Sequence, residues 1–328
     1  MKPVLRLLPV LVLPMFFAGC DPETELTNTI YKDEMRQLVE ELSAYGKEIK
    51  PGFLVIPQNG QELITIDGNA GSDTELVYLN AIDAVGREDL FYGYIRDNRA
   101  TPEDETERML EYLVKCEENG IAVLVTDYCS SEDKIDDSYL RNRNYGFASF
   151  AAPDRDLGVI PGYPESPEGK NQDNINGMAE VRNFLYLINP ENYASQAEFI
   201  TALEKTDYDL LLIDAFGPDG ELLQNSDLSH LKEKASGGHR LLIAYLSIGE
   251  AEDYRYYWKE EWNNNPPSWM EAENPDWQGN YKVRYWDSAW KAILFGNENA
   301  YLDKILSAGF DGVYLDIIDA FEYFENLE

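Results

Sequence analysis

The chain has 328 residues and a formal net charge of −34, because 61 Asp and Glu residues outnumber 27 Lys and Arg residues. An acidic surface repels phosphate groups, so this charge excludes nucleic acid as a partner. The charge also disfavours polyanionic glycans and suits neutral or cationic ones, although solubility alone would explain it equally well. With only His230, His239 and three cysteines, the sequence disfavours histidine triads, histidine metal clusters and zinc sites, so carboxylates must carry any catalysis.

The first residues look like a targeting signal. Lys2 and Arg6 precede an apolar core that ends in small residues before Cys20. This pattern resembles a bacterial lipoprotein signal, so we expect cleavage after residue 19 and a lipid anchor on Cys20, which would hold the protein outside the cytoplasm in the bacterial cell envelope. The alternatives are an ordinary secretory signal or a short membrane helix. Residues 20–30 then form a polar tether.

After the tether, a helix is predicted over residues 31–45, with apolar residues on one face. Beyond it, short apolar runs alternate with helical patterns, which is typical of a parallel sheet. The runs cover residues 53–56, 90–94, 121–126, 147–150, 184–188, 210–213, 241–246, 282–286 and 313–317. About eight strands close a barrel, so we predict an α/β fold, a (β/α)8 TIM barrel, in which the surplus run 147–150 is not a strand.

A boundary between two domains would be polar and rich in Pro and Gly, and residues 163–177 are the one candidate. Neither half of the chain has enough strands to close alone, so we predict a single domain over residues 31–328, with this segment as a long loop. Cys116 and Cys129 either form one disulfide or are separately buried.

Polar side chains follow most of the predicted strands, and a barrel would gather them at one mouth. They are Gln58, Asn59, Asp127, Asn189, Asp214, Glu250, Glu252, Asp287, Asp316 and Asp319. A single acid at a strand end is more often a helix cap, but five or more strands ending in acids or amides favour a site. Carboxylates at close range raise one another's pKa, which gives one proton donor and one ionised partner.

All six tryptophans follow the run 241–246 closely. They are Trp258, Trp262, Trp269, Trp277, Trp286 and Trp290. Aromatic faces beside paired acids suit a polysaccharide site, since glycosidic bonds are cleaved by two carboxyl groups. Large aromatic residues also fill cores, so we predict that two or three of the six border a glycan groove.

Several long motifs resemble a known family. They are residues 56–63 (IPQNGQEL), 86–93 (GREDLFYG), 247–258 (SIGEAEDYRYYW), 277–286 (WQGNYKVRYW) and 309–320 (GFDGVYLDIIDA). Together they are similar to glycosidases related to glycoside hydrolase family 114, the endo-α-1,4-polygalactosaminidases. The resemblance implies a (β/α)8 barrel that acts on galactosamine-containing polymers. It also implies a catalytic pair, with Glu252 as general acid/base and Asp214 as nucleophile or stabilising carboxylate. Glu250 is the rival to Glu252.

The remaining site residues are expected to contact substrate. They are Asn59, Asp127, Tyr245, Arg255, Trp286, Asp316 and Asp319. In the family, segments like 56–63 and 86–93 follow the strand that resembles the one ending at Asp316, whereas here they precede Asp214. This order predicts a circular permutation, with the helix at 31–45 taking the place after the last strand. Glu250 and Ala251 replace smaller or uncharged residues of the family, so the substrate is expected to differ.

These features predict an extracytoplasmic, lipid-anchored glycoside hydrolase that cleaves a polysaccharide with two carboxylates, without a cofactor and with retention at the sugar. The alternative is a non-catalytic glycan-binding lipoprotein that uses the same aromatic groove. Such a protein needs the tryptophans but not the acids. A purely structural surface protein explains neither feature.

Overall fold

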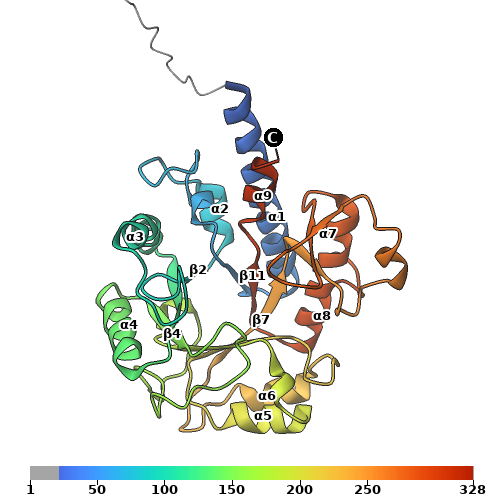
Figure 1. Ribbon diagram of the computed structural model, residues 1–328. Coiled ribbons are helices and arrows are strands. Elements are labelled where there is room, and N and C mark those ends of the chain that lie inside the picture. Colours follow the sequence, from blue (N-terminus) through green and yellow to red (C-terminus); the bar gives the residue numbers. More distant parts are fainter. Residues whose placement is uncertain (1–21, 328) are drawn as a thin grey trace, which may run out of the picture.

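The structure is a computed structural model that describes residues 22–327, and it is an α/β fold built on parallel strands. The parallel strands are β1 (Leu54–Pro57), β2 (Ala84–Glu88), β3 (Ala122–Tyr128), β4 (Ala148–Ala152), β5 (Phe184–Leu187), β6 (Leu210–Ile213), β7 (Leu241–Ser247) and β11 (Gly312–Asp316). Helices lie around the strands in Figure 1. They are α1 (Pro22–Ile49), α2 (Leu76–Ala81), α3 (Glu103–Glu118), α4 (Glu132–Asn144), α5 (Gln196–Glu204), α6 (Asn225–Leu231), α7 (Ser288–Leu294), α8 (Tyr301–Ala308) and α9 (Ala320–Glu325).

The parallel strands form two sheets that adjoin at both edges. One sheet has the order β1-β11-β7-β6-β5 and the other the order β2-β3-β4. Single parallel bridges connect them, from Gln58 to Gly86 beside β1 and β2, and from Ser149 to Asn183 beside β4 and β5. The carboxyl ends of all these strands therefore point to the same side of the molecule, where a parallel fold presents its functional groups.

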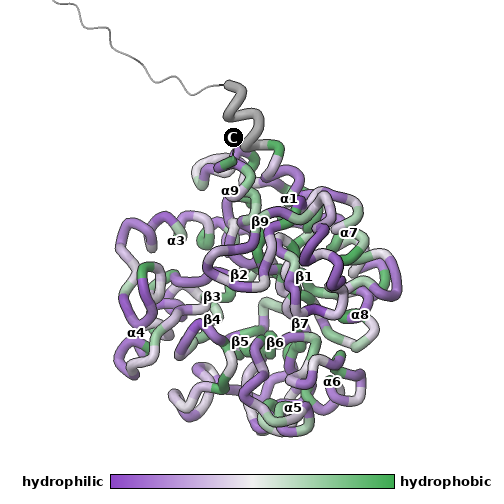
Figure 2. Tube along the Cα trace, turned by 45° about the vertical axis from the view of Figure 1, so that its right-hand side comes forward, coloured by the Kyte–Doolittle hydropathy of each residue, from purple (hydrophilic) through white to green (hydrophobic). Residues whose placement is uncertain are grey.

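The strands and helices follow from their sequence patterns. Every residue of β5, β6 and β7 is buried, as expected for parallel strands covered on both faces. Helix α3 buries Met109, Leu113 and Cys116, which lie on one face at helical spacing. Figure 2 shows the result, with hydrophilic residues along the outer helices and hydrophobic residues along the strands.

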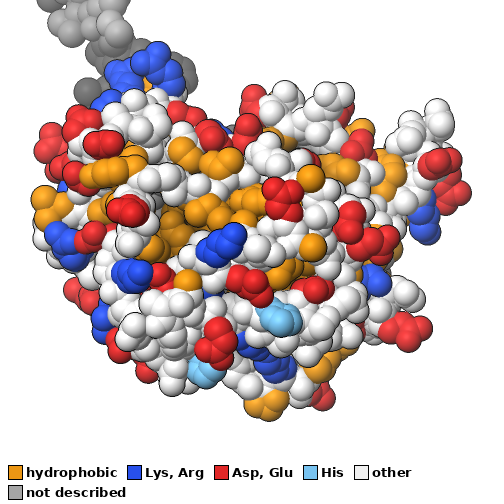
Figure 3. Space-filling view, turned by 90° about the horizontal axis from the view of Figure 1, so that it is seen from below, with side chains coloured by type: hydrophobic (Ala, Val, Ile, Leu, Met, Phe, Trp, Pro, Cys, Tyr) orange, Lys and Arg blue, Asp and Glu red, His pale blue; other side chains and the backbone are white. Residues whose placement is uncertain are grey.

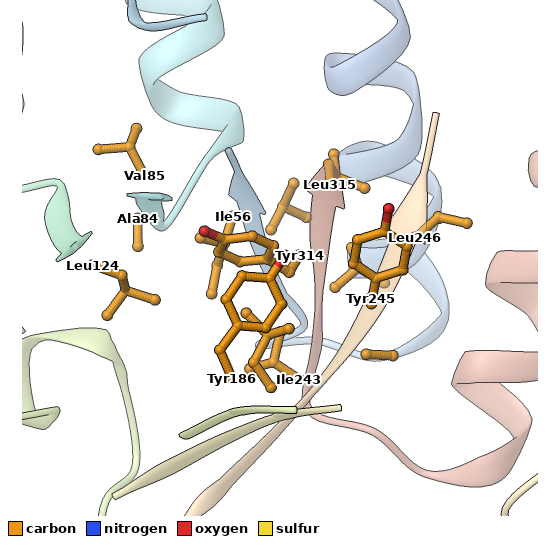
Figure 4. Close-up of a cluster of buried hydrophobic side chains, with 14 of the residues drawn as sticks. Ile56, Ala84, Val85, Leu124, Tyr186, Ile243, Tyr245, Leu246, Tyr314 and Leu315 are labelled. Atoms are coloured by element: carbon orange, nitrogen blue, oxygen red, sulfur yellow. The ribbon is translucent and has the colours of Figure 1, made fainter. Parts of the chain in front are cut away.

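Two tyrosine rings fill the space between the strands. Tyr186 on β5 and Tyr314 on β11 meet with ring centroids 5.4 Å apart, and Figure 4 shows them pointing toward each other. A Cβ added at Gly86 would lie 2.0 Å from the hydroxyl oxygen of Tyr314. The glycine in β2 is therefore required by the size of the ring that packs against it.

Three of the strand predictions were wrong in part. Residues 90–94 lie in a loop, and the strand in this region is β2, which was missed because Gly86, Arg87 and Glu88 break its apolar pattern. Most of the run 147–150, set aside as surplus, belongs to β4, since residues 148–150 lie in this strand and pair with β3. The run 282–286 lies partly in β10 (Asn280–Val283), which is antiparallel to its neighbours.

Strand β10 belongs to a small sheet inserted between β7 and α7. Its order is β8 (Glu250–Glu252), β10 and β9 (Met270–Glu273). Four tryptophans pack beside it in a row, with ring centroids 5.3 Å apart for Trp258 and Trp262, 5.3 Å for Trp262 and Trp269, and 5.1 Å for Trp269 and Trp290. These side chains stabilise the insertion, so most of the tryptophans serve packing.

Short 3-10 turns occur at Gln61–Ile64, Met178–Glu180, Pro190–Asn192 and Glu260–Asn263. Residues 163–177 lie in the long connection between β4 and β5.

Cys116 and Cys129 are both free and buried, and burial raises the pKa of each thiol to about 12. Of the two predicted alternatives for this pair, separate burial is therefore the observed one.

The N-terminal helix begins earlier than predicted. Helix α1 begins at Pro22, so the part of the expected tether within the described residues is helical. A proline is compatible with a first helical turn, because its missing N–H would have no acceptor within the helix. The predicted signal and Cys20 lie outside the described residues. Within residues 22–327, no helix is long and apolar enough to cross a membrane.

The two ends of the described chain lie together. Figure 1 shows α9 beside α1, and Lys32 forms an ion pair of 2.5 Å with Glu325. Tyr31 stacks on Phe324 with ring centroids 5.6 Å apart. Strands β11 and β1 are parallel neighbours in the sheet. Helices α9 and α1 together therefore take the place of the helix that would connect β11 to β1 along the chain.

Candidate active site

A cavity of about 300 Å³ lies at the carboxyl ends of the parallel strands. Eight of the predicted site residues line it: Asn59, Asp214, Tyr245, Glu250, Glu252, Arg255, Asp316 and Asp319. They come from β1, β6, β7, β8, β11 and the segments that directly follow these strands. The structure thus brings together residues that are up to 260 positions apart in the sequence.

Asp214 and Glu252 share one arginine in this cavity. Arg255 Nη1 lies 2.6 Å from Asp214 Oδ2, and Arg255 Nε lies 2.7 Å from Glu252 Oε2. Arg255 Nη2 donates a second hydrogen bond of 3.3 Å to Glu252 Oε1. All three side chains are less than one-tenth exposed, so one guanidinium bridges two carboxylates away from bulk water.

The environment of Asp214 both raises and lowers its pKa. Burial raises the pKa above its ordinary value, and the positive charge of Arg255 opposes that rise. Asp214 Oδ1 also accepts a hydrogen bond of 2.8 Å from the backbone N–H of Phe216. The carboxyl group that follows β6 is therefore held in one orientation by contacts to each of its oxygens.

Glu252 is held by two tyrosines as well as by Arg255. The hydroxyl of Tyr254 donates to Glu252 Oε1 at 2.6 Å. The hydroxyl of Tyr257 accepts a hydrogen bond of 2.9 Å from the backbone N–H of Glu252. Both carboxylate oxygens of Glu252 thus have donors, and its position on β8 is fixed.

Glu250 has different partners. Its Oε1 lies 2.6 Å from Lys282 Nζ and accepts a hydrogen bond of 2.8 Å from Asn274. Both glutamates lie on β8 of the inserted sheet, but Glu252 is linked through Arg255 to Asp214, whereas Glu250 pairs with Lys282. The two glutamates therefore differ in their partners, and their catalytic roles stay a prediction.

A second set of carboxyl groups lies at the end of β2, at the end of β11 and just after β11. Burial raises the pKa of Asp316 to about 7, with a further contribution from the negative charge of Glu88, and Asp316 Oδ2 accepts a hydrogen bond of 2.7 Å from the hydroxyl of Tyr245. Burial also raises the pKa of Asp319 to about 6. Two groups in one cavity therefore titrate near neutral pH.

Glu88 is a cavity residue that sequence reasoning missed. It accepts hydrogen bonds from Gln58 at 2.6 Å, from Asn59 at 3.1 Å, and from the hydroxyl of Tyr128. The sequence did contain a signal for Glu88, because this residue is the last of β2 and stands in one of the motifs that resemble the family, residues 86–93. It was overlooked because the strand was placed at residues 90–94, which moved the strand end beyond Glu88.

Gln58 and Asn189, predicted at strand ends, also line the cavity, and so does Trp277, the one tryptophan of the predicted six among its lining residues, fewer than the two or three expected. Arg155 is a cavity residue that was not predicted. Arg155 pairs with Asp89 at 2.8 Å and with Asp97 at 2.7 Å, and its guanidinium lies 4.1 Å from the ring centroid of Tyr128. Burial raises the pKa of Asp89 to about 6, against the opposing charge of Arg155. Trp277 is half exposed at the cavity.

Two of the predicted substrate contacts lie elsewhere. Asp127 is fully buried, where it accepts hydrogen bonds from the backbone of Phe91 and Tyr92 and from Ser138 and Asn142. It fixes the loop after β2 rather than bordering the cavity, because a buried carboxylate takes backbone donors where they are available. Trp286 packs against Tyr31 and Phe324, with ring centroids 5.4 Å and 4.7 Å away. This tryptophan joins the insertion to α1 and α9.

No group of three or more His, Cys, Asp or Glu side chains among residues 22–327 is arranged to hold a metal ion. Asp287, another residue predicted at a strand end, caps α7 by accepting a hydrogen bond of 2.8 Å from the N–H of Ala289.

Comparison with known proteins points to one family. The model of glycoside-hydrolase family GH114 matches residues 190–328 of this chain. Over these residues the chain is similar to that family. The matched segment contains Asp214, Glu250, Glu252, Arg255, Asp316 and Asp319, whereas Asn59 and Glu88 precede it.

Three similar proteins carry no assigned function in their names. An uncharacterized protein of Methanocaldococcus jannaschii is 42% identical over 155 residues, which cover 47% of this chain and 42% of the relative. An uncharacterized protein of Deinococcus radiodurans is 41% identical over 127 residues, or 39% of this chain and 38% of the relative. An uncharacterized protein of Thermotoga maritima is 54% identical over 81 residues, or 25% of this chain and 24% of the relative. The chain thus spans less than half the length of each of these relatives.

Proposed function

We propose that this protein is a glycoside hydrolase that cleaves a polysaccharide with Asp214 and Glu252 as its two carboxylates. The observation that supports it best is Arg255, which contacts both side chains inside the cavity. Two carboxyl groups flanking one bond are the usual requirement for glycoside hydrolysis. The relationship to family GH114 supports the same reaction class.

In this proposal Glu252 is the general acid/base and Asp214 is the nucleophile or stabilising carboxylate. Asp214 must be ionised for that role, and Arg255 favours its charged form against the effect of burial. To protonate a leaving group, Glu252 must carry a proton of its own, so its carboxylic acid form gives up a contact with Arg255 or Tyr254 and donates this proton to the glycosidic oxygen. Glu252 recovers the proton from the water that hydrolyses the glycosyl intermediate. The shared guanidinium keeps the carboxyl groups close, so we expect retention at the sugar, which proton NMR of the first product tests.

The proposed substrate is a neutral or cationic polymer such as one containing galactosamine. Glu88, Asp316 and Asp319 line the cavity and form no ion pair with Lys or Arg among the described residues. The whole chain carries a formal net charge of −34. Acidic side chains are also spread over the face seen in Figure 3. A carboxylate-rich cavity favours an ammonium group and disfavours uronic acids.

We also propose that the two parallel sheets form one (β/α)8 barrel, circularly permuted relative to the family, in a single domain. The bridges at both sheet edges support closure, and the adjacency of α1 and α9 supports permutation, since such termini can be joined and reopened elsewhere. The N-terminal signal and lipidated Cys20 would place the enzyme on the outer side of a bacterial membrane.

The experiment is reducing-end release from a panel of polysaccharides, including partly deacetylated α-1,4-galactosaminogalactan, by protein that starts at Asp21. Glu252→Gln is compared with wild type, and Glu271→Gln is the matched control because Glu271 pairs with Arg284 on the same inserted sheet outside the cavity. Release by wild type and the control, but not by Glu252→Gln, is the expected result. Tight binding of one polymer without release would instead favour the glycan-binding lipoprotein.

A further inference from the structure

The inserted sheet carries polar atoms that the proposed catalytic pair does not use. Strand β8 pairs with β10 so that Glu250 is opposite Lys282 and Glu252 is opposite Asn280. Glu250 and Asn280 both line the cavity. Trp277, three residues before Asn280, lines it too and is half exposed.

Two of these polar atoms are buried without a hydrogen-bond partner. Glu250 is 1% exposed, and while its Oε1 is bound by Lys282 and Asn274, its Oε2 has no partner among the described residues. The same is true of Asn280 Oδ1. A buried acceptor that stays unpaired destabilises a protein by about 1–3 kcal/mol, so two of them in one cavity require an explanation.

We propose that Glu250 and Asn280 form a subsite that binds the hydroxyl groups of a sugar ring lying on Trp277. This inference rests on the proposed glycosidase function and adds a specificity-determining pair to it. A ring on an aromatic face directs its hydroxyl groups sideways, toward the acceptors of the neighbouring strands. Hydrogen bonds from the sugar would satisfy both buried oxygens, and a site built to accept them rejects sugars that lack them.

The charges around Glu250 favour a neutral donor. Lys282 Nζ lies 2.6 Å from Glu250 Oε1 and already neutralises the carboxylate. A second cation beside Lys282 would be repelled, whereas a hydroxyl would not. The subsite therefore differs from the side of the cavity formed by Glu88, Asp316 and Asp319, which make no ion pair with Lys or Arg among the described residues.

The ion pairs of Glu250 also distinguish the proposed binding role of this residue from a catalytic role. Arg255 connects Asp214 to Glu252 and makes no ion pair with Glu250 among the described residues. Glu250 is therefore a binding residue whose loss weakens substrate affinity. A general acid would instead control turnover.

The test compares wild type, Glu250→Gln and Glu250→Ala on the polysaccharide that wild type cleaves, with Glu271→Gln as control. Thermal unfolding verifies that each variant is folded. We expect KM to rise about ten-fold or more in the Glu250 variants, with kcat and its pH profile nearly unchanged. A loss of kcat by several orders of magnitude would show that Glu250 is catalytic, and unchanged KM would show that it does not bind substrate. Either result overturns the inference.

A calorimetric titration with oligosaccharides of the same panel keeps this inference distinct from the proposed function. If wild type cleaves no polymer, the proposed function fails, but a weaker affinity of Glu250→Gln than of Glu271→Gln for one oligosaccharide still supports the subsite. If no oligosaccharide binds wild type, the subsite is refuted together with the proposed function.

Discussion

Arg255 donates a 2.6 Å hydrogen bond to Asp214, a residue 41 positions earlier in the chain. The two come from different parts of the fold, since Asp214 directly follows β6 whereas Arg255 follows β8 in the insertion. The same guanidinium binds Glu252. This one contact therefore couples the inserted sheet to the parallel strands at the point where the proposed chemistry occurs.

Replacing either proposed catalytic carboxyl group should abolish turnover and preserve the fold. For Asp214→Asn and Glu252→Gln, we expect kcat to fall by about 10²–10⁴-fold or more, because each loses an interaction made in the transition state. Initial rates of reducing-end release measure the effect, and circular dichroism verifies folding. Retention of most activity by either variant would contradict the assignment.

Removing Arg255 should destabilise the protein. Arg255→Met leaves Asp214 and Glu252 as two buried carboxylates without their shared cation, so we expect the free energy of unfolding to fall by about 3–5 kcal/mol. Urea denaturation measures this change. Arg284→Met is the control, since its pair with Glu271 is half exposed and should contribute about 1 kcal/mol or less. Equal effects of the two substitutions would show that the Arg255 contacts are not important for stability.

The pKa of about 7 for Asp316 predicts a pH dependence of stability. The folded state binds this proton more tightly than the unfolded state, whose pKa is near 3.8, so the contribution is fully present below pH 3.8 and is lost as pH rises to about 7. Asp316→Asn should therefore lose less stability than wild type between these pH values, as measured by urea midpoints.

Asp67 provides a control, because its pKa is shifted in the opposite direction from that of Asp316. Its pKa is lowered to about 2, first by a backbone hydrogen bond from Asn69, so its contribution is present above pH 3.8 and is lost as pH falls toward 2. Asp67→Asn should leave the profile between pH 4 and pH 7 unchanged. If Asp316→Asn gives the same profile as wild type in that range, Asp316 has no raised pKa.

A methyl group at Gly86 should disrupt the packing of Tyr314. The added Cβ would lie 2.0 Å from the hydroxyl oxygen and 2.5 Å from Cζ of Tyr314, so Gly86→Ala should lower the free energy of unfolding by about 1–3 kcal/mol. Gly71→Ala is the control, because no atom lies within 4 Å of its added Cβ. Thermal and urea unfolding compare the two, and similar stabilities would refute the close packing.

The proposed lipid anchor has a direct test. In a bacterial host that processes lipoproteins, the full chain should incorporate radiolabelled palmitate and sediment with membranes, whereas Cys20→Ser should do neither. Cys129→Ser is the control, because Cys129 is buried in the described fold. Labelling of Cys20→Ser, or no labelling of wild type, would rule out the anchor at this position.

Much of the parallel sheet was predictable because buried strands are local apolar runs. Strands β1, β3, β5, β6, β7 and β11 all coincide with predicted runs. Strand β2 did not, because a strand of alanine, valine, glycine, arginine and glutamate has no such run and is held by its neighbours. The run at 282–286 was misassigned because the same apolar pattern serves an antiparallel strand in an insertion.

The sequence by itself determined the residue types of the site, since acids placed directly after parallel strands must reach the same side of the sheet. Only the tertiary structure decided how these acids divide: Glu252 with Arg255 and Asp214, Glu250 with Lys282, and Glu88 with Gln58 and Asn59. It also placed Asp127 and Trp286 in packing roles outside the cavity. The reason is physical, because hydrophobic periodicity is a property of neighbouring residues, whereas ion pairing and burial depend on atoms brought together across the whole chain.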